Sequence, residues 1–414
     1  MSGYLNARRS GLLEMGPGGA AMARRAWWVV LVLLVWILVA AGTVSAQSPT
    51  RKIIMFRDGV DEAAKGEVVR QFGGKPLKQL GLVNATVAEI SQASTSALVG
   101  SQMVVGIEDD IRLREDVVGN PPVLSPDRRQ GGGKGGPGQS GEATPWGVEQ
   151  IRAPEAWRFS EGGVKVAILD SGIDLSHPDL KVAGGVNEIE PGKSYNDDRG
   201  HGTHVAGIVA ALANGRGIVG VAPDARLYAV KVIDKNGEVW VSDVIDGLQW
   251  SVTNGMRVAN MSFGSSQDSR ALRRAVTRAY SAGLLMVASA GNAGPAPNSV
   301  HYPAAYPEVL AVSALDRSDH IAPWSSVDPQ IALAAPGVDI YSTYLGGGYA
   351  TLSGTSMAAP HVTGVAALRL RLHPDESPAD VAEALKKSAD RLPGLTCDQQ
   401  GAGRVDALGA VTRR

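Results

Sequence analysis

Three reactive side chains stand where strand patterns end or helix patterns begin. Asp170 follows the apolar run "VKVAIL", His201 opens the helical stretch "HGTHVAGIVAAL", and Ser356 opens "SMAAPHVTGVAALRL". A serine hydroxyl is a weak nucleophile unless a neutral imidazole takes its proton as it attacks a carbonyl. A buried carboxylate would hold that imidazole in one tautomer. The three residues together predict acyl transfer, with Ser356 as nucleophile, His201 as base and Asp170 as the group that orients the base.

Each of these residues also has an ordinary structural explanation. Asp170 could cap a turn, His201 could begin a helix without reacting, and Ser356 is a natural helix N-cap. Their joint occurrence favours catalysis, because only that interpretation uses all three. The tetrahedral intermediate also needs fixed donors for its oxyanion. The backbone amide of Ser356 and the side-chain amide of Asn292, in "VASAGNAGP", are the candidates.

The elements that must position these residues begin near Pro145. Near-continuous apolar segments alternate there with helical stretches: "VKVAILD", "ARLYAVKVI", "VANMSF", "LLMVASAG" and "EVLAVSAL". Strands that are apolar throughout are typical of a parallel sheet covered on both faces. The pattern predicts a doubly wound, mostly parallel α/β fold. In such sheets reactive groups gather where strands end and helices begin.

A smaller α+β unit is predicted ahead of this fold. Residues 51–116 show a strand, an amphipathic helix, two strands, a second helix and a last strand, the order of a ferredoxin-like unit. Residues 117–143 are rich in glycine and proline and lack hydrophobic periodicity, which indicates a flexible, protease-accessible linker.

The N-terminal segment has the pattern of a secretory signal. Arg24 and Arg25 precede the apolar run "AWWVVLVLLVWILVAA", and "VSA" follows before Gln47. We therefore expect a signal peptide over 1–46, a unit over 47–116, a linker over 117–143, a main domain over 144–414, and a secreted protein. An uncleaved N-terminal membrane anchor is the alternative. The single cysteine, Cys397, excludes an intramolecular disulfide.

Composition limits the classes of partner. The chain has 414 residues, 44% of them hydrophobic and 20% charged, which fits a globular protein with a sizeable core. Its formal net charge of −1 provides no electrostatic footprint for nucleic acid, so no nucleic-acid partner is expected. A monomer is the default expectation.

Five segments in order, "AILDSGID", "HGTHVAG", "NMSFG", "SAGN" and "GTSMAAPHV", resemble the signature blocks of subtilisin-like serine proteases, the peptidase S8 family. The resemblance runs from Pro145 to the C-terminal "GAGRVDALGAV". It implies an endopeptidase acting on proteins and peptides, with Asp170, His201 and Ser356 as its triad and Asn292 in its oxyanion hole.

Residues 47–116 resemble the inhibitor-type propeptide of the same family. Such a propeptide assists folding and then blocks the cleft as an intramolecular inhibitor. The resemblance thus implies a precursor that processes itself, with the first cut near Asp116.

The resemblance also assigns substrate contacts. An extended peptide would add as a strand between two exposed edges, which favours broad specificity. P1 denotes the substrate residue whose carbonyl is attacked, P2 the residue before it, and S1 and S2 the pockets that hold them. No acid stands among the residues implied for the S1 walls, so we expect an apolar P1 residue. The implied edges are Gly237, Glu238, Val239, Ser262, Phe263 and Gly264, and the S1 walls are 262–264 with Ala288, Ser289, Ala290 and Gly291.

A structural calcium site is the last implication of the resemblance, and it would suit a chain without disulfides. Carboxylate, amide and backbone oxygens are the ligands that Ca²⁺ prefers. A simple turn at Asn214-Gly215 is the alternative. The implied ligands are Glu142, Asp179, Leu212, Asn214, Arg216 and Ile218.

Two other functions fit part of the pattern. An α/β-hydrolase esterase also places serine at a strand-to-helix turn, but "GTSMA" lacks the last glycine of its motif and the triad order differs. A binding module derived from a protease would keep the fold, although all four predicted catalytic groups are present. Elsewhere, residues 196–198, "NDD", are expected to form a solvated loop, and His204 to pack in the core.

Overall fold

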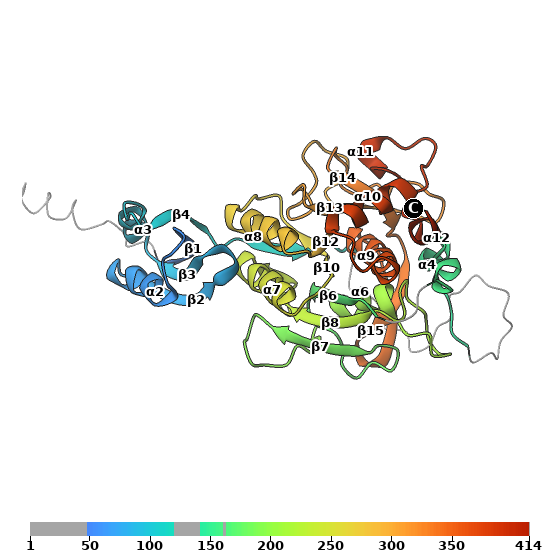
Figure 1. Cartoon of the computed structure of the whole chain (residues 1–414), viewed down its shortest axis with the longest axis horizontal. Helices are drawn as coiled ribbons and strands as arrows, with labels where there is room; N and C mark the ends of the chain where they lie inside the picture. The colour runs from blue at the N-terminus through green and yellow to red at the C-terminus, as the bar shows by residue number, and fades with distance from the viewer. Residues whose placement is uncertain (1–47, 120–140, 160–162, 414) are drawn as a thin grey trace, which may run out of the picture. The chain divides into compact units, whose positions relative to one another are not determined.

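The computed structural model describes residues 48–119, 141–159 and 163–413 (Figure 1). The expected signal peptide and most of the expected linker lie outside the described residues. No helix in the described part is both long and apolar enough to cross a bilayer.

The first described part is a small antiparallel unit. Its sheet has the order β2-β3-β1-β4, which confirms the predicted ferredoxin-like arrangement. Asp61 and Ser91 cap its two helices by accepting backbone N–H bonds, as N-cap residues do. The elements are β1 (Thr50–Phe56), α2 (Glu62–Gln71), β2 (Lys75–Leu80), η1 (Gly81–Val83), β3 (Ala85–Ile90), α3 (Gln92–Val99) and β4 (Val104–Asp109).

The main sheet has seven strands in the order β14-β13-β12-β10-β6-β8-β7. Every pairing between its neighbours is parallel, which confirms the predicted doubly wound α/β fold. The five strands expected from apolar runs are β6, β8, β10, β12 and β13, and β7 and β14 form the edges. The bounds are β6 (Lys165–Asp170), β7 (Val182–Asn187), β8 (Arg226–Lys231), β10 (Val258–Met261), β12 (Leu285–Ser289), β13 (Val309–Leu315) and β14 (Ile331–Pro336).

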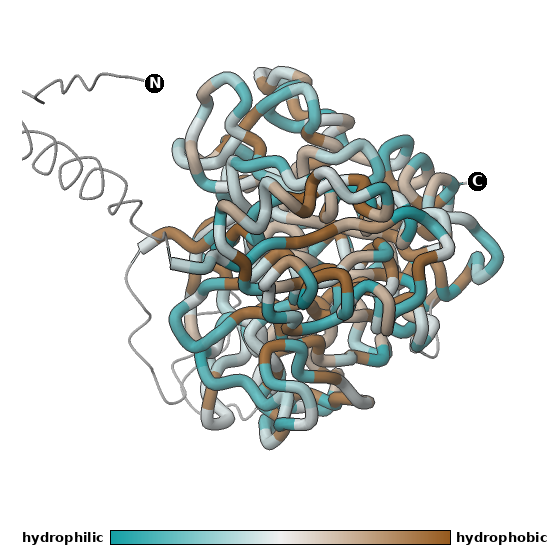
Figure 2. Tube along the Cα trace, turned by 90° about the vertical axis from the view of Figure 1, so that its left-hand side faces the viewer, coloured by the Kyte–Doolittle hydropathy of each residue, from teal (hydrophilic) through white to brown (hydrophobic). Residues whose placement is uncertain are grey.

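Helices cover both faces of this sheet. On β6, Val166 and Ile168 join a buried cluster with α6 (His201–Ala210) and α9 (Thr355–Leu372). The alternate residues Ala167 and Leu169 join a second cluster with α7 (Val241–Thr253) and α8 (Arg270–Ser281). Successive strand side chains point to opposite faces, so a strand buried on both faces is apolar throughout. In Figure 2 hydrophobic segments accordingly run through the middle of the molecule.

Shorter elements complete the fold. A hairpin of β15 and β16 lies just ahead of α9, and α10 begins with a capping box in which Ser377 and Asp380 bond each other's backbone. The remaining bounds are α4 (Trp146–Gln150), α5 (Ala153–Trp157), β15 (Ile340–Tyr344), η2 (Leu345–Gly347), β16 (Gly348–Leu352), α11 (Cys397–Gln400) and α12 (Ala407–Thr412).

The N-terminal sheet packs on α7 and α8. Ile53 and Met55 of β1 belong to the same buried cluster as those helices, whereas Ile54 and Phe56 pack with α2 on the other face. The carboxylate of Glu108 accepts the N–H groups of Arg270 (3.1 Å) and Ala271 (3.0 Å) at the start of α8. A negative charge at a helix N-terminus is stabilising. The sheet is thus held by apolar contact on one face and a helix cap at its edge.

A third sheet joins the two parts and was not predicted. Strand β5 (Arg112–Glu115) lies between β9 (Glu238–Trp240) and β11 (Phe263–Gly264), antiparallel to both. The residues that follow β4 therefore cross the main domain as the middle strand of a sheet.

Candidate active site

Asp170 and His201 form a buried pair at the carboxyl end of β6. Oδ1 of Asp170 lies 2.7 Å from Nδ1 of His201. Burial opposes a charge on the imidazole, but the carboxylates of Asp170 and Glu115 outweigh it and raise the pKa of His201 to about 9. The Nε2 atom has no hydrogen-bond partner in the described part of the chain. That nitrogen is therefore available to accept a proton whenever the imidazole is neutral.

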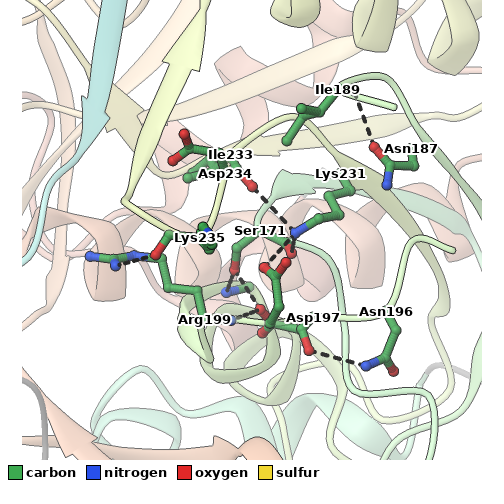
Figure 3. Close-up of polar contacts among 12 residues, drawn as sticks. Ser171, Asn187, Ile189, Asn196, Asp197, Arg199, Lys231, Ile233, Asp234 and Lys235 are labelled. Atoms are coloured by element: carbon green, nitrogen blue, oxygen red, sulfur yellow. Dashed lines mark hydrogen bonds and ion pairs between the residues drawn. The ribbon is translucent and has the colours of Figure 1, made fainter. Parts of the chain in front are cut away.

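A polar network holds the start of α6 in place (Figure 3). The Asp197 carboxylate accepts the N–H groups of Arg199, Gly200 and Thr203, each at 2.9 Å. It also accepts the hydroxyl of Ser171 at 2.8 Å, and Ser171 is the residue directly after Asp170. The network therefore ties the base's helix to the strand end that carries the carboxylate.

Two outlying charges belong to this network. The Lys231 ammonium, on β8, donates to the carbonyl of Ser171 (2.6 Å) and to Asp198 (2.7 Å).

Asp197 is only 3% exposed, so the expectation of a solvated loop at 196–198 was wrong for this residue. Its carboxylate is buried because it caps α6.

Ser356 lies in the first turn of α9. Its hydroxyl donates to the carbonyl of Ser262 (2.9 Å) and accepts the amide N–H of Asp116 (3.1 Å). The amide N–H of Ser356 donates to the carbonyl oxygen of Asp116 (3.3 Å). The nucleophile candidate and a peptide carbonyl are thus directly apposed.

Asn292 follows β12 and is oriented by α9. Its Oδ1 accepts the amide N–H of Thr355 (3.1 Å) and the hydroxyl of Thr355 (3.0 Å). This fixes the amide so that Nδ2 is the outward atom, and Nδ2 has no partner among the described residues. An unpaired buried donor costs free energy unless an acceptor arrives. It is suited to a developing oxyanion.

Residues 112–118 occupy the cleft as an extended peptide. Leu113 pairs with Val239, and Glu115 pairs with Phe263, so the expected edges at 237–239 and 262–264 flank β5. Beyond Asp116, the amide N–H of Val118 donates to the carbonyl of Ser353 (2.8 Å). The peptide bond between Asp116 and Val117 therefore lies next to Ser356.

The side chain of Asp116 points into the expected S1 pocket. Its Oδ2 accepts the hydroxyl of Ser289 (2.8 Å), and its Oδ1 lies 3.2 Å from Nδ1 of His301. Ala288 and Ala290 are buried beside Ser289, and Ala290 accepts the amide of His301 (2.8 Å). The side chain that enters this expected pocket is thus a carboxylate.

His301 was missed by the sequence reasoning. Cβ atoms built on Gly264 and Gly291 would lie 2.5 Å and 2.7 Å from its side chain, so these two wall residues are glycines because His301 fills the space between them. The signal that could have found it is the position of "SVHYP", directly after the "AGNAGPAPN" stretch that carries Asn292.

Arg199 was also missed, and it contacts the residue before Asp116. Its Nε donates to Glu115 (2.6 Å), and its Nη2 bonds the other carboxylate oxygen. A Cβ on Gly237 would lie 2.8 Å from this guanidinium, so the glycine makes room for it. Burial opposes ionisation of Glu115, but Arg199 outweighs it and lowers the pKa of that carboxyl.

The residues expected at a calcium site lie together. Asp179 accepts the N–H of Ile218 (3.0 Å) and the side-chain amide of Asn214 (3.0 Å), and Glu142 accepts the N–H of Asn214 (2.7 Å). Leu212 and Arg216 belong to the same loop through backbone bonds to Asp179 and Asn214. Burial raises the pKa of Asp179, as expected for a carboxylate that would gain from a cation.

These donors fit a hard cation, since all are oxygens. In the described residues no three His, Cys, Asp or Glu side chains gather as a metal group, so backbone carbonyls would have to complete this site.

The arrangement is that of an acyl-transfer enzyme: a base held by a carboxylate, a serine at a helix start, and donors around the attacked carbonyl. The Subtilase family model matches residues 161–403. Subtilisin E of Bacillus subtilis is 38% identical over 387 residues, which cover 90% of this chain and 95% of the relative. A thermostable alkaline protease of Halalkalibacterium halodurans is 46% identical over 253 residues, 61% of this chain and 69% of the relative.

A solved structure is also similar. Fervidolysin from Fervidobacterium pennivorans, a keratinolytic enzyme related to subtilisin, superposes with a TM-score of 0.74 at 28% identity over 88% of this chain, which spans 61% of fervidolysin. The chain belongs to the Subtilase family, peptidase S8, and is a serine endopeptidase. Family membership also decides against the α/β-hydrolase alternative.

Proposed function

We propose that this chain is the precursor of a secreted endopeptidase that cleaves its own bond between Asp116 and Val117. One observation carries the proposal: the carbonyl of Asp116 accepts the amide of Ser356 while β5 lies between β9 and β11. A chain held in this way favours attack, because two backbone hydrogen bonds keep the Asp116 peptide beside Ser356.

In the acylation step, Ser356 Oγ redirects its proton from the Ser262 carbonyl to the free Nε2 of His201 and attacks the carbonyl carbon of Asp116. The C=O electron pair moves to the oxygen, where the Ser356 amide and Asn292 Nδ2 stabilise the charge. As the intermediate collapses, His201 returns the proton to the nitrogen of Val117, which leaves as an amine. Asp170 keeps the imidazole oriented and stabilises it while protonated.

Water completes the reaction. With Val117 released, a water molecule gives its proton to His201 and attacks the ester between Ser356 and Asp116. The ester bond breaks, Ser356 recovers its proton, and Asp116 becomes a free carboxylate terminus. The enzyme ends in its starting form, as catalysis requires.

Residues 47–116 then act as an intramolecular inhibitor and folding aid. The support is that they keep β5 in the cleft and pack on α7 and α8 through the cluster that includes Ile53 and Met55. Protein and peptide substrates would take the place of β5 through main-chain hydrogen bonds. The apolar P1 preference expected from the sequence stays a prediction, and Asp116 takes the P1 position in the self-cleavage proposed here.

Three further features belong to the proposal. Export rests on the charged, apolar and small-residue pattern of residues 1–46. A structural Ca²⁺ would be held by Glu142, Asp179 and Asn214, with the carbonyls of Leu212, Arg216 and Ile218, and would stabilise the loop. The mature enzyme is proposed to act as a monomer.

The test compares intact masses of the chain from residue 47 to residue 414, as wild type and as Ser356→Ala. We expect the wild type to yield a fragment ending at Asp116, and the variant to stay whole. Ser251→Ala, which alters another buried serine whose hydroxyl bonds only within its own helix among the contacts described, is the matched control and should still be cut. A wild-type chain that folds but is never cut would contradict the proposal.

A further inference from the structure

The segment in the cleft has two adjacent acidic residues directly before the bond that is proposed to be cleaved. Glu115 stands at P2 and Asp116 at P1, and their side chains are 13% and 7% exposed. Burying a carboxylate is unfavourable unless it is paired or hydrogen-bonded. Both acids have such partners, and the partners belong to the main domain.

The P1 partners are built into the fold. Ser289 ends β12 and is fully buried, while His301 occupies the space left by Gly264 and Gly291. All contacts described for the Asp116 carboxylate come from these two side chains. The side-chain hydrogen bond that the Asp116 carboxylate accepts from His301 outweighs burial and raises the pKa of His301.

The P2 partner is equally well placed. Arg199 makes a two-pronged contact with Glu115, the geometry that distinguishes guanidinium from other cations. The carbonyl of Lys235 accepts its Nη1 at 3.1 Å, and Gly237 leaves room beside it. The guanidinium is therefore held where a P2 carboxylate arrives.

We propose that this endopeptidase selects substrates with an acidic residue at P1 and an acidic residue at P2, with His301 and Ser289 reading P1 and Arg199 reading P2. This inference rests on the proposed function, in which Ser356 attacks the carbonyl of the P1 residue. It makes the precursor's own sequence, "RLRED" followed by "VV", an example of the substrate class.

The rival explanation is proximity. A tethered segment has a high effective concentration and could be cut even if its side chains fitted poorly. Selectivity must therefore be measured on separate peptides. The test uses processed enzyme from the full chain and fluorogenic peptides Arg-Leu-Arg-Glu-X-Val-Val, in which X is Asp, Glu, Asn, Phe or Lys. A second set replaces the P2 Glu by Gln.

We expect kcat/KM to be at least about tenfold higher for Asp or Glu at P1 than for Asn, Phe or Lys, since hydrogen bonds to charged groups are stronger than those to neutral ones. His301→Leu should abolish that preference and leave the P2 effect intact. Arg199→Gln should do the reverse. The matched controls are His320→Leu and Arg371→Gln, which alter exposed residues and should change neither preference.

Labelling by a fluorophosphonate separates the two proposals. Enzyme that is labelled but prefers Phe at P1 overturns the acidic selectivity and leaves the proposed function standing. If nothing is labelled, the proposed function fails, and the subsite is judged by the NMR titration of His301 in the Ser356→Ala precursor. The pKa of His301 is compared between this precursor and the same precursor carrying Asp116→Asn. A lower pKa in the doubly changed protein supports the P1 contact, and an unchanged pKa overturns it.

Discussion

Asp116 and Ser356 hold each other by two reciprocal hydrogen bonds, although they are 240 residues apart in sequence. The amide of Asp116 donates to the Ser356 hydroxyl at 3.1 Å, and the amide of Ser356 donates to the Asp116 carbonyl at 3.3 Å. The fold of one chain thus places the proposed nucleophile beside the carbonyl that we propose it attacks. The predictions below concern what surrounds this contact.

Asn292→Ala should slow self-cleavage without unfolding the precursor. The change removes the unpaired Nδ2 donor, and the expected loss of rate is about 10² to 10³, the magnitude known for such a donor in subtilisin itself. The rate is measured by following the fragment that ends at Asp116 during refolding. Asn298→Ala, in the loop that follows, is the control, and a rate equal to wild type in the Asn292 variant would exclude its role.

The pH dependence of self-cleavage should respond to Glu115. Burial opposes charge on His201, but Asp170 and Glu115 raise the pKa of its imidazole to about 9 in the precursor. Since only the neutral imidazole accepts a proton, the rate should rise with pH through that range. Glu115→Gln removes one of the raising charges, so the midpoint of the rate profile should move to lower pH.

The measurement is the first-order rate of fragment release over a series of buffers. Glu383→Gln, which alters an exposed carboxylate on α10, should leave the midpoint unchanged. A midpoint that moves upward in Glu115→Gln would show that Glu115 does not act on His201 through its charge.

Asp197→Ala should destabilise the protein and weaken catalysis together. The carboxylate accepts three backbone N–H groups at the start of α6, and its loss leaves buried donors unpaired. We expect the free energy of unfolding to fall by about 2 kcal/mol or more. Denaturant titration in the Ser356→Ala background avoids self-digestion. Asp375→Ala, which alters an exposed carboxylate, should lose much less, and equal losses would contradict the capping role.

Calcium removal should lower thermal stability. An ion present at about 100 times its Kd stabilises the folded state by about 2.7 kcal/mol, so excess chelator should lower the Tm by several degrees. Asp179→Asn should lower the Tm in calcium and make it insensitive to chelator. Both are measured by calorimetry in the Ser356→Ala background. A wild-type Tm that is the same with and without chelator would exclude a structural ion.

Much of the fold could be read from local patterns. The strands β6, β8, β10, β12 and β13 are continuous apolar runs because both of their faces are buried. The edge strands gave weaker signals: β7 contains two glycines, and β14 ends at Pro336. The order of elements in the N-terminal unit followed from the same change between periods of two and 3.6 residues.

The candidate chemistry could be predicted from residue types alone, because Asp170, His201 and Ser356 stand at the junctions where α/β sheets expose reactive groups. The proposed target of that chemistry could not, because it depends on how distant segments pack together. The S1 contact joins Asp116, Ser289 and His301, which lie in three separate segments, and no periodicity or spacing links them. Likewise the sequence predicts that Asp197 is solvated, but its side chain is buried. Burial depends on which distant segments fold over a residue.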